Sequence, residues 1–184
     1  MNFLWENFFR KGQKNRTLAH TLSETFLFED LTSREINLLL NTVHVRKYRP
    51  GEYIFRQGEA GVGMYIIVEG NVDIATEDER AKEPDASQEN SYVTRLKPGD
   101  FFGELALVEK KSRRSASAIS CGESTLIGFF KPDLVDLTER SPSTGVKIVN
   151  RLSEVLGRRL RETTTKITEL RRQLEYLKPK KSNK

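Results

Sequence analysis

The residues best suited to chemistry lie between positions 101 and 118, which read FFGELALVEKKSRRSASA. The first part, residues 101–107, is predicted to form a short helical turn. Gly103 lets the backbone approach another group closely, and the free amides of such a turn point outward as donors to an anion. Glu104 adds a carboxylate that can accept hydrogen bonds from hydroxyl groups.

Ten residues further on, the chain supplies a cation and a hydroxyl group at Arg114 and Ser115. Ala116 and Ala118 alternate with polar residues there, and this alternation predicts a strand. A glycine–glutamate pair or a strand arginine alone is usually an ordinary surface feature. Together they place amide donors, a hydroxyl acceptor and a guanidinium around one spot, which is the set that a ribose joined to a phosphate needs.

The order Phe-Gly-Glu-Leu-Ala-Leu followed by Arg-Ser-Ala resembles the phosphate-binding cassette of the cyclic nucleotide-binding domain family. The resemblance implies that a cyclic mononucleotide is the ligand. Arg114 would pair with its phosphate, the amides of residues 103–106 would hold that phosphate from the other side, and Glu104 would accept the ribose 2′-hydroxyl. Ser115 would donate to the phosphate or to a purine edge. The implied binding residues in this stretch are Phe102, Gly103, Glu104, Leu105, Ala106, Arg114, Ser115 and Ala116.

A long helix is predicted over residues 141–178, starting at Ser141 and Pro142, which suit an N-cap and a first turn. Its apolar residues recur at heptad spacing, with one irregular step between Leu156 and Leu160 that resembles a stutter. This pattern favours a parallel homodimer over a helix that covers only its own domain. The predicted seam consists of Val149, Leu152, Leu156, Leu160, Thr163, Ile167, Leu170, Leu174 and Leu177.

Within this helix, RLSEVLGRRLRETTTKITEL is similar to the dimer helix of the bacterial cAMP receptor proteins. That resemblance implies that Thr163 contacts the purine of its own subunit and that Thr164 contacts the purine of the partner subunit. It favours cAMP over cGMP. The alternative is that these threonines are small residues that the seam tolerates.

The remaining sequence predicts the frame for this site. Residues 17–40 show helical periodicity, and short alternating segments separated by glycine turns then predict strands. The predicted fold is α+β, an antiparallel, jelly-roll-like β-roll of eight strands with flanking N-terminal helices and a long C-terminal dimerisation helix. We expect an N-terminal aromatic and basic segment at 1–16, the binding roll with its helices at 17–140, the dimer helix at 141–178 and a basic tail at 179–184. Residues 76–91 are predicted to form an exposed loop, to which no function is assigned.

Composition excludes several classes of protein. The 184 residues carry a net charge of +5, one cysteine and two histidines. These counts give neither an internal disulfide nor a set of metal ligands, and no catalytic triad or phosphate-binding Walker loop is present. Neither a signal peptide nor an apolar run long enough to span a bilayer is found. We therefore expect a cytoplasmic protein that is not an enzyme.

The predicted output is a signal to a partner protein of unknown identity. Only about seven residues follow Leu177, too few for a helix-turn-helix domain, so sequence-specific DNA binding is not expected. Three alternatives remain open: a scaffold that binds nucleic acid through its basic tail, a scaffold whose residues 3–9 contact a membrane, and a family member that binds cGMP or no nucleotide.

Overall fold

The computed structural model describes residues 16–77 and 90–177. The predicted aromatic segment, nearly all of the predicted loop and the basic tail lie outside these described residues. Among the residues that are described, no helix has the length and apolar character needed to cross a membrane.

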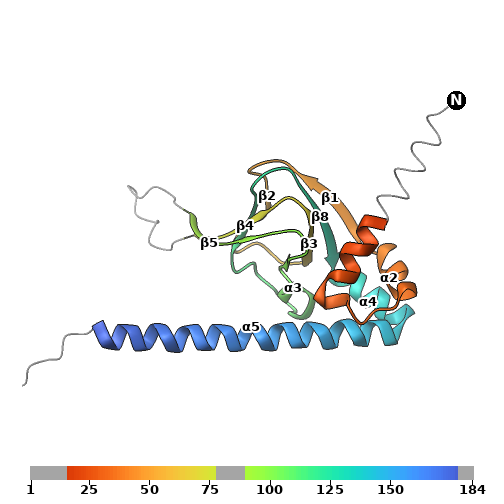
Figure 1. The fold of residues 1–184 in the computed structure, drawn as a ribbon. Coiled ribbons are helices and arrows are strands. Elements are labelled where there is room, and N and C mark those ends of the chain that lie inside the picture. Colours follow the sequence, from red (N-terminus) through yellow and green to blue (C-terminus); the bar gives the residue numbers. More distant parts are fainter. Residues whose placement is uncertain (1–15, 78–89, 178–184) are drawn as a thin grey trace, which may run out of the picture.

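The described residues form eight strands in two antiparallel sheets of four. One sheet has the order β1-β8-β3-β6 and the other has the order β2-β7-β4-β5 (Figure 1). This confirms the predicted β-roll. The strands are β1 (His44–Tyr48), β2 (Tyr53–Phe55), β3 (Gly63–Glu69), β4 (Val72–Glu77), β5 (Asn90–Leu96), β6 (Phe101–Phe102), β7 (Ser117–Ser120) and β8 (Ser124–Phe130).

Helices gather at one end and along one side of the roll (Figure 1). Residues 16–24 are helical, as the periodicity of residues 17–40 predicted. The other helices are the 3-10 turn η1 (Phe26–Phe28), α2 (Ser33–Leu40), α3 (Leu105–Val108), α4 (Lys131–Arg140) and α5 (Pro142–Leu177).

One local prediction is wrong. Residues 101–107 were expected to form a single helical turn, whereas Phe101 and Phe102 are strand β6, paired with Ile66 and Tyr65 of β3. Both phenylalanines are buried, and pairing with β3 supplies hydrogen bonds to backbone groups that burial removes from water. The helix begins only after Gly103, whose φ of 77° reverses the chain between strand and helix.

The first half of α5 is part of the domain core. Its buried residues are Thr144, Gly145, Ile148, Leu152 and Val155, and the apolar ones belong to the cluster that also contains the N-terminal helices and one sheet. The predicted seam is therefore wrong at Leu152, which is fully buried inside its own domain. Half-buried Leu156 also packs against this core.

Two charged contacts fix this half of α5 to the N-terminal helices. Lys147 Nζ lies 2.8 Å from Glu35 Oε2. This bond first, and hydrogen bonds from Thr32 and Thr144 after it, lower the pKa of Glu35 from its usual 4.5 to about 2. Arg151 Nε lies 2.6 Å from Asp30 Oδ2, and its Nη2 lies 2.7 Å from Glu29 Oε1. The hydrogen bond from Arg151 also lowers the pKa of Asp30.

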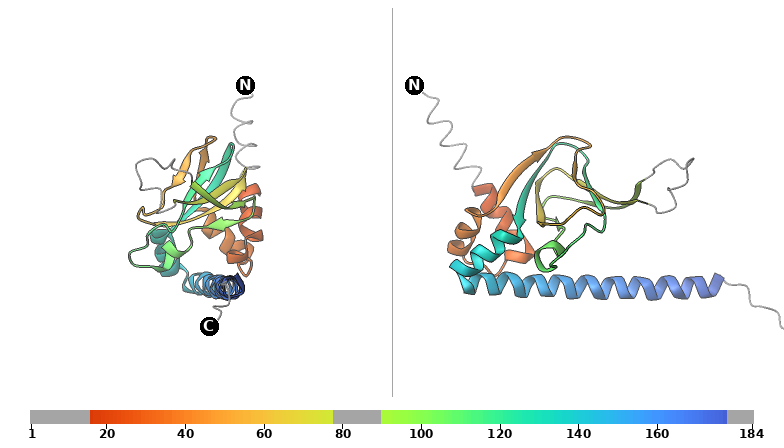
Figure 2. Two further views of the ribbon diagram at one scale, coloured as in Figure 1. Left: turned by 90° about the vertical axis from the view of Figure 1, so that its left-hand side faces the viewer. Right: turned by 180° about the vertical axis from the view of Figure 1, so that it is seen from behind.

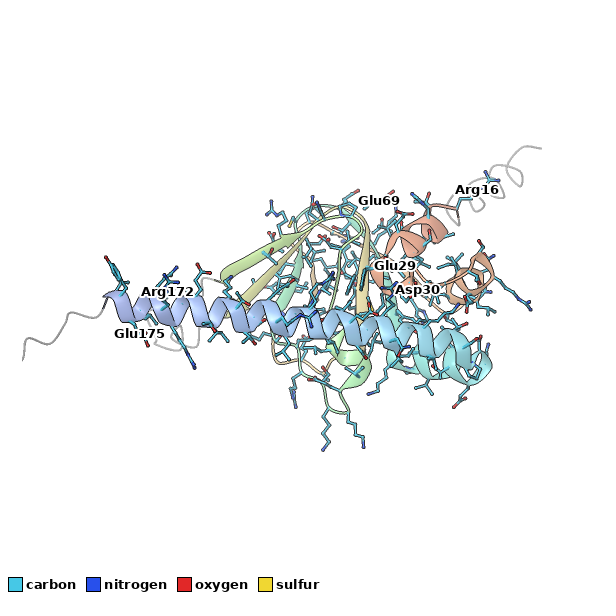
Figure 3. All side chains as sticks on the ribbon, turned by 60° about the horizontal axis from the view of Figure 1, so that its bottom comes forward. Arg16, Glu29, Asp30, Glu69, Arg172 and Glu175 are labelled. Carbon is cyan, nitrogen blue, oxygen red and sulfur yellow. The ribbon has the colours of Figure 1, made fainter. Side chains whose placement is uncertain are left out.

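The second half of α5 runs past the roll and touches little of it (Figure 2). Every residue from 158 to 177 is exposed, including Leu160, Ile167, Leu170, Leu174 and Leu177. Figure 3 shows both halves of α5: Glu29 and Asp30 lie against the helix near the roll, while Arg172 and Glu175 lie at the far end of the helix.

Candidate functional site

The backbone of Arg114 is held by the segment between β2 and β3. The Arg114 N–H donates to the carbonyl of Glu59 at 2.9 Å, and its own carbonyl accepts from the amide of Gly58 at 2.8 Å. The guanidinium lies over the ring of Phe55, 4.0 Å from the ring centroid, and its Nη1 donates to the carbonyl of Gly103 at 3.2 Å. Burial removes water from this guanidinium and lowers its pKa. An anion beside it would stabilise the charged form and so offset part of this loss.

Gly103 is required at this point for a second reason. A Cβ atom here would approach Arg114 Nη1 to 2.5 Å, so any side chain would displace the guanidinium. The amides of Ala106 and Leu107 donate to the carbonyls of Gly103 and Glu104. The amide of Leu105, at the start of α3, has no acceptor within the helix.

Glu104 is almost fully buried, with 3% of its surface exposed. One carboxylate oxygen, Oε1, accepts a hydrogen bond from Arg159 Nη1 of α5. Arg159 also donates through Nη2 to the carbonyl of Phe101 at 3.3 Å. The carboxylate is therefore tied directly to the long helix, 55 residues away in the sequence.

Two buried polar atoms of opposite character lack a hydrogen-bond partner among the described residues. They are Glu104 Oε2, an acceptor, and Arg114 Nε, a donor. Both residues line one cavity of about 240 Å³. Because a buried polar group without a partner costs free energy, a ligand that offers both a donor and an anionic acceptor would bind here favourably.

The cavity brings together eight of the ten predicted binding residues. Its lining includes Phe102, Gly103, Glu104, Leu105, Ala106, Arg114, Ser115 and Ala116. Thr163 and Thr164 do not line it. They lie on the exposed part of α5, where their hydroxyls donate to the carbonyls of Arg159 and Leu160. Thr163 thus lies one helical turn beyond the residue that holds Glu104.

Sequence reasoning missed eight residues that also line the cavity: Phe55, Ile74, Thr94, Leu96, Phe101, Ser112, Arg113 and Arg159. Five of them are strand residues, and their pattern predicts only that they belong to a sheet. Ser112 and Arg113 directly precede Arg114 in the loop before β7. Arg159 lies among four arginines between residues 151 and 161. No local signal distinguishes it from the other three.

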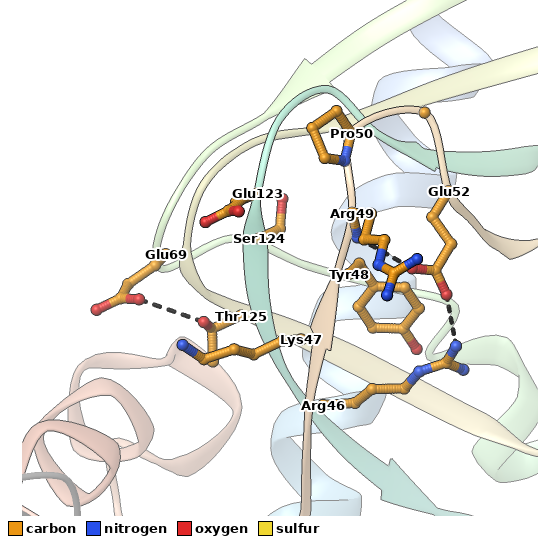
Figure 4. Close-up of a pocket in the computed structure, with 11 residues that line it drawn as sticks. Arg46, Lys47, Tyr48, Arg49, Pro50, Glu52, Glu69, Glu123, Ser124 and Thr125 are labelled. Carbon is orange, nitrogen blue, oxygen red and sulfur yellow. Dashed lines mark hydrogen bonds and ion pairs between the residues drawn. The ribbon is translucent and has the colours of Figure 1, made fainter.

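A larger cavity of about 930 Å³ lies elsewhere, between the turn after β1 and the ends of β3 and β8. Figure 4 shows two of the interactions within it: Arg46 pairs with Glu52, and Thr125 donates to Glu69. Within the described residues, none of its buried polar atoms lacks a partner. Its size alone therefore does not make it the better candidate.

Comparison with known proteins identifies the family. The model of the cyclic nucleotide-binding domain matches residues 45–141, more than half of the chain and all of the cavity-lining residues except Arg159. The chain belongs to the cyclic nucleotide-binding domain family. The predicted resemblance is therefore confirmed.

Related proteins of this family are regulators and channels. A cyclic AMP receptor protein of Thermus thermophilus is 32% identical over 136 residues, covering 74% of this chain and 57% of the relative. The cAMP-activated global transcriptional regulator of Salmonella typhimurium is 32% identical over 141 residues, covering 76% and 61%. A putative potassium channel protein of Rhodopseudomonas palustris is 33% identical over 149 residues, covering 81% and 33%. The chain thus spans less than two thirds of the length of each of these relatives.

Solved structures agree with the fold. The catabolite activator protein of Thermus thermophilus superposes with a TM-score of 0.67 at 30% identity, covering 79% of this chain and 62% of that one. A cyclic nucleotide-binding domain from Methylobacillus flagellatus reaches a TM-score of 0.69 at 19% identity, covering 85% and 84%. At that identity the second likeness supports the β-roll alone.

Proposed function

We propose that this protein is a cAMP sensor that signals to a partner protein through α5. The observation that carries the proposal is the pair of buried, unpartnered atoms, Glu104 Oε2 and Arg114 Nε, in one cavity. A cyclic mononucleotide carries an anionic phosphate that would accept from Arg114 and a ribose hydroxyl that would donate to Glu104. Membership of the cyclic nucleotide-binding family supports the same ligand class.

In this proposal, Arg159 links the ligand to the helix. The Arg159 guanidinium neutralises Glu104 next to the position of an anionic phosphate, which reduces the repulsion between the two negative groups. A hydroxyl donated to Glu104 Oε2 would fix the carboxylate whose Oε1 binds Arg159. Because Arg159 is part of α5, binding in the roll would then favour one arrangement of the helix over another.

The choice of cAMP rests on Thr163 and Thr164, one turn beyond Arg159 on the exposed helix. We propose that α5 pairs in parallel with the α5 of a second copy through its exposed apolar stripe. Thr163 would then contact the purine of its own subunit and Thr164 that of the partner. The stripe consists of Val149, Leu160, Ile167, Leu170, Leu174 and Leu177, each exposed by between 41% and 75%.

Isothermal titration of the purified protein with cAMP and cGMP tests the ligand, with Arg114→Leu as the decisive variant. Leaving a buried phosphate unpaired should cost about 3–5 kcal/mol, a loss of several hundredfold or more in affinity. Arg46→Leu is the matched control, because Arg46 also lies over an aromatic ring, 4.4 Å from the centroid of Tyr48, but in the larger cavity. If Arg46→Leu abolishes binding and Arg114→Leu does not, the site has been assigned to the wrong cavity.

The role of Glu104 is tested with 2′-deoxy-cAMP, which lacks only the hydroxyl in question. The wild-type protein should bind it at least tenfold more weakly than cAMP, because burying Glu104 against a ligand without the donor leaves the acceptor unpaired. A wild-type protein that binds both nucleotides equally would show that Glu104 does not recognise the ribose.

A further inference from the structure

Four exposed aliphatic side chains belong to three adjoining segments: α3, α4 and the turn before β3. We call them the α3–α4 patch; they are Val62, Leu105, Val108 and Val135. Each exposes between 41% and 56% of its surface. The Lys131 N–H donates to the carbonyl of Val62 at 2.9 Å, and Lys131 Nζ donates to the carbonyl of Glu109 at 2.8 Å. The first turn of α4 therefore lies against both the turn before β3 and the end of α3.

The nucleotide site does not account for this patch. Leu105 lines the cavity, but Val62, Val108 and Val135 do not. The core does not account for it either, because the buried residues of α3 are Ala106 and Leu107, which lie on the other side of the same short helix. Adjoining apolar side chains in water are typical of surfaces that bind another molecule, whereas isolated ones are ordinary.

The charges around the patch are mainly positive. Four cations lie on the same segments: Lys110, Lys111 and Arg113 on the loop after α3, and Lys131 at the start of α4. Arg113 also lines the nucleotide cavity, whereas the three lysines do not. Two of them donate only to neutral carbonyls, Arg113 to Gly58 and Lys131 to Glu109. In the described parts of the chain none of the four forms an ion pair. The charges of the three lysines are therefore available to a partner.

We propose that the α3–α4 patch docks a segment of a partner protein that carries aliphatic side chains flanked by aspartate or glutamate. The aliphatic residues would cover the three valines and Leu105, and the acidic residues would pair with the loop cations. This inference goes beyond nucleotide binding and does not depend on it.

Two other occupants fit the charges less well. A second copy would present its exposed stripe on α5, but the stripe is accompanied by Arg161, Lys166 and Arg171, so cations would face cations. For a membrane surface, the patch offers valines and a leucine but no aromatic residue to anchor it at the interface. Glu59 and Glu109 would also lie close to anionic lipid and be repelled by it. A protein segment can place its acidic residues so that these two glutamates are avoided.

The docking test uses a fluorescein-labelled synthetic helical peptide built from leucine, alanine and glutamate, with nucleotide-free full-length protein, followed by fluorescence anisotropy. The double charge reversal Lys110→Glu with Lys111→Glu should raise the dissociation constant at least tenfold, because two attractive exposed contacts become repulsive. The matched control is Lys47→Glu with Lys97→Glu, two exposed lysines outside the patch, which should change the constant less than twofold. Equal effects of the two double variants would overturn the proposal.

The apolar part of the docking site is tested separately. Val135→Ser should weaken the peptide severalfold, whereas Val146→Ser, a valine of α5 with a similar exposure of 56%, should leave binding unchanged. Circular dichroism verifies that all variants remain folded. The proposal is overturned if a peptide with lysine in place of glutamate binds equally well, or if the protein binds phosphatidylglycerol vesicles but not the acidic peptide.

Discussion

The two halves of α5 share one helix but have opposite surroundings. From Pro142 to Val155, one face of the helix is buried against the N-terminal helices and the roll. From residue 158 onwards the side chains are exposed, although the same apolar periodicity continues. The difference teaches that a regular apolar stripe defines a face that requires a partner, whereas only the tertiary structure shows which partner each part of the face has.

Truncation of a leucine should distinguish the two halves most strongly. Leu152 is fully buried, so Leu152→Ala should lower the free energy of unfolding by about 2–5 kcal/mol. Leu174 is 60% exposed, so Leu174→Ala should change that free energy by less than about 0.5 kcal/mol in the monomer. Urea unfolding at a protein concentration that keeps the chain monomeric measures both. Similar losses would show that the halves are not distinct.

The sequence predicts the periodicity of α5 but not its division. The heptad spacing treats Leu152 and Leu174 alike, because both are leucines of the same apolar stripe. What separates them is contact with η1 and α2, for example from Lys147 to Glu35. These contacts join residues more than a hundred positions apart in the sequence, and no local pattern encodes them.

The candidate site shows the same limit at a smaller scale. The cassette predicted Glu104 and Arg114 correctly as neighbours of one cavity, because their roles follow from a short motif with a fixed order. Phe101 and Phe102 were assigned to a helix because the strand that they join, β3, lies far back in the sequence. Arg159 was missed because it reaches the cavity only after α5 folds along the roll.

Dimer formation should depend on the distal half of α5, whereas the stability of the monomer depends on the proximal half. The double variant Leu170→Asn with Leu174→Asn should raise the dissociation constant of the dimer at least thirtyfold, about 2 kcal/mol, because two apolar contacts are lost. Sedimentation velocity across a concentration series measures this change. A control, Val135→Asn on α4, should leave association unchanged. A wild-type chain that stays monomeric at high concentration, with and without cAMP, contradicts the proposed dimer.

The pH dependence of stability should arise from the proximal half. The pKa of Glu35 is lowered to about 2, chiefly by its bond to Lys147. The ionised folded form is therefore favoured, so this contribution is present above about pH 4.5 and is lost as the pH falls towards 2. Glu35→Gln should cost about 1–2 kcal/mol at pH 7, allowing for screening by solvent, and almost nothing near pH 2.

Urea unfolding at a series of pH values from 7 to 2 measures this effect. Glu169→Gln, on the exposed half of α5, is the matched control and should change stability by less than about 0.5 kcal/mol at every pH. If the cost of Glu35→Gln does not decrease with falling pH, the contact with Lys147 does not stabilise the charged form.

Glycine to alanine substitutions should change the free energy of unfolding in opposite directions at two positions of α5. A Cβ on Gly157 would meet only Arg161 Nη1, at 3.7 Å. Since alanine is the better helix former, Gly157→Ala should raise the free energy of unfolding by about 0.5–1 kcal/mol. A Cβ on Gly145 would collide with the side chain of Thr138, so Gly145→Ala should lower it by about 1–3 kcal/mol.

Gly157 also lies where the buried and exposed halves meet and where the heptad pattern is irregular, between Leu156 and Leu160. If the two halves of α5 move relative to each other when nucleotide binds, a stiffer helix at this point should reduce the ligand-induced change. Cross-linking of cysteines placed along the distal half, with and without cAMP, measures that change in wild type and in Gly157→Ala. A variant that is more stable but responds to cAMP as the wild type does would show that the helix moves as one rigid body.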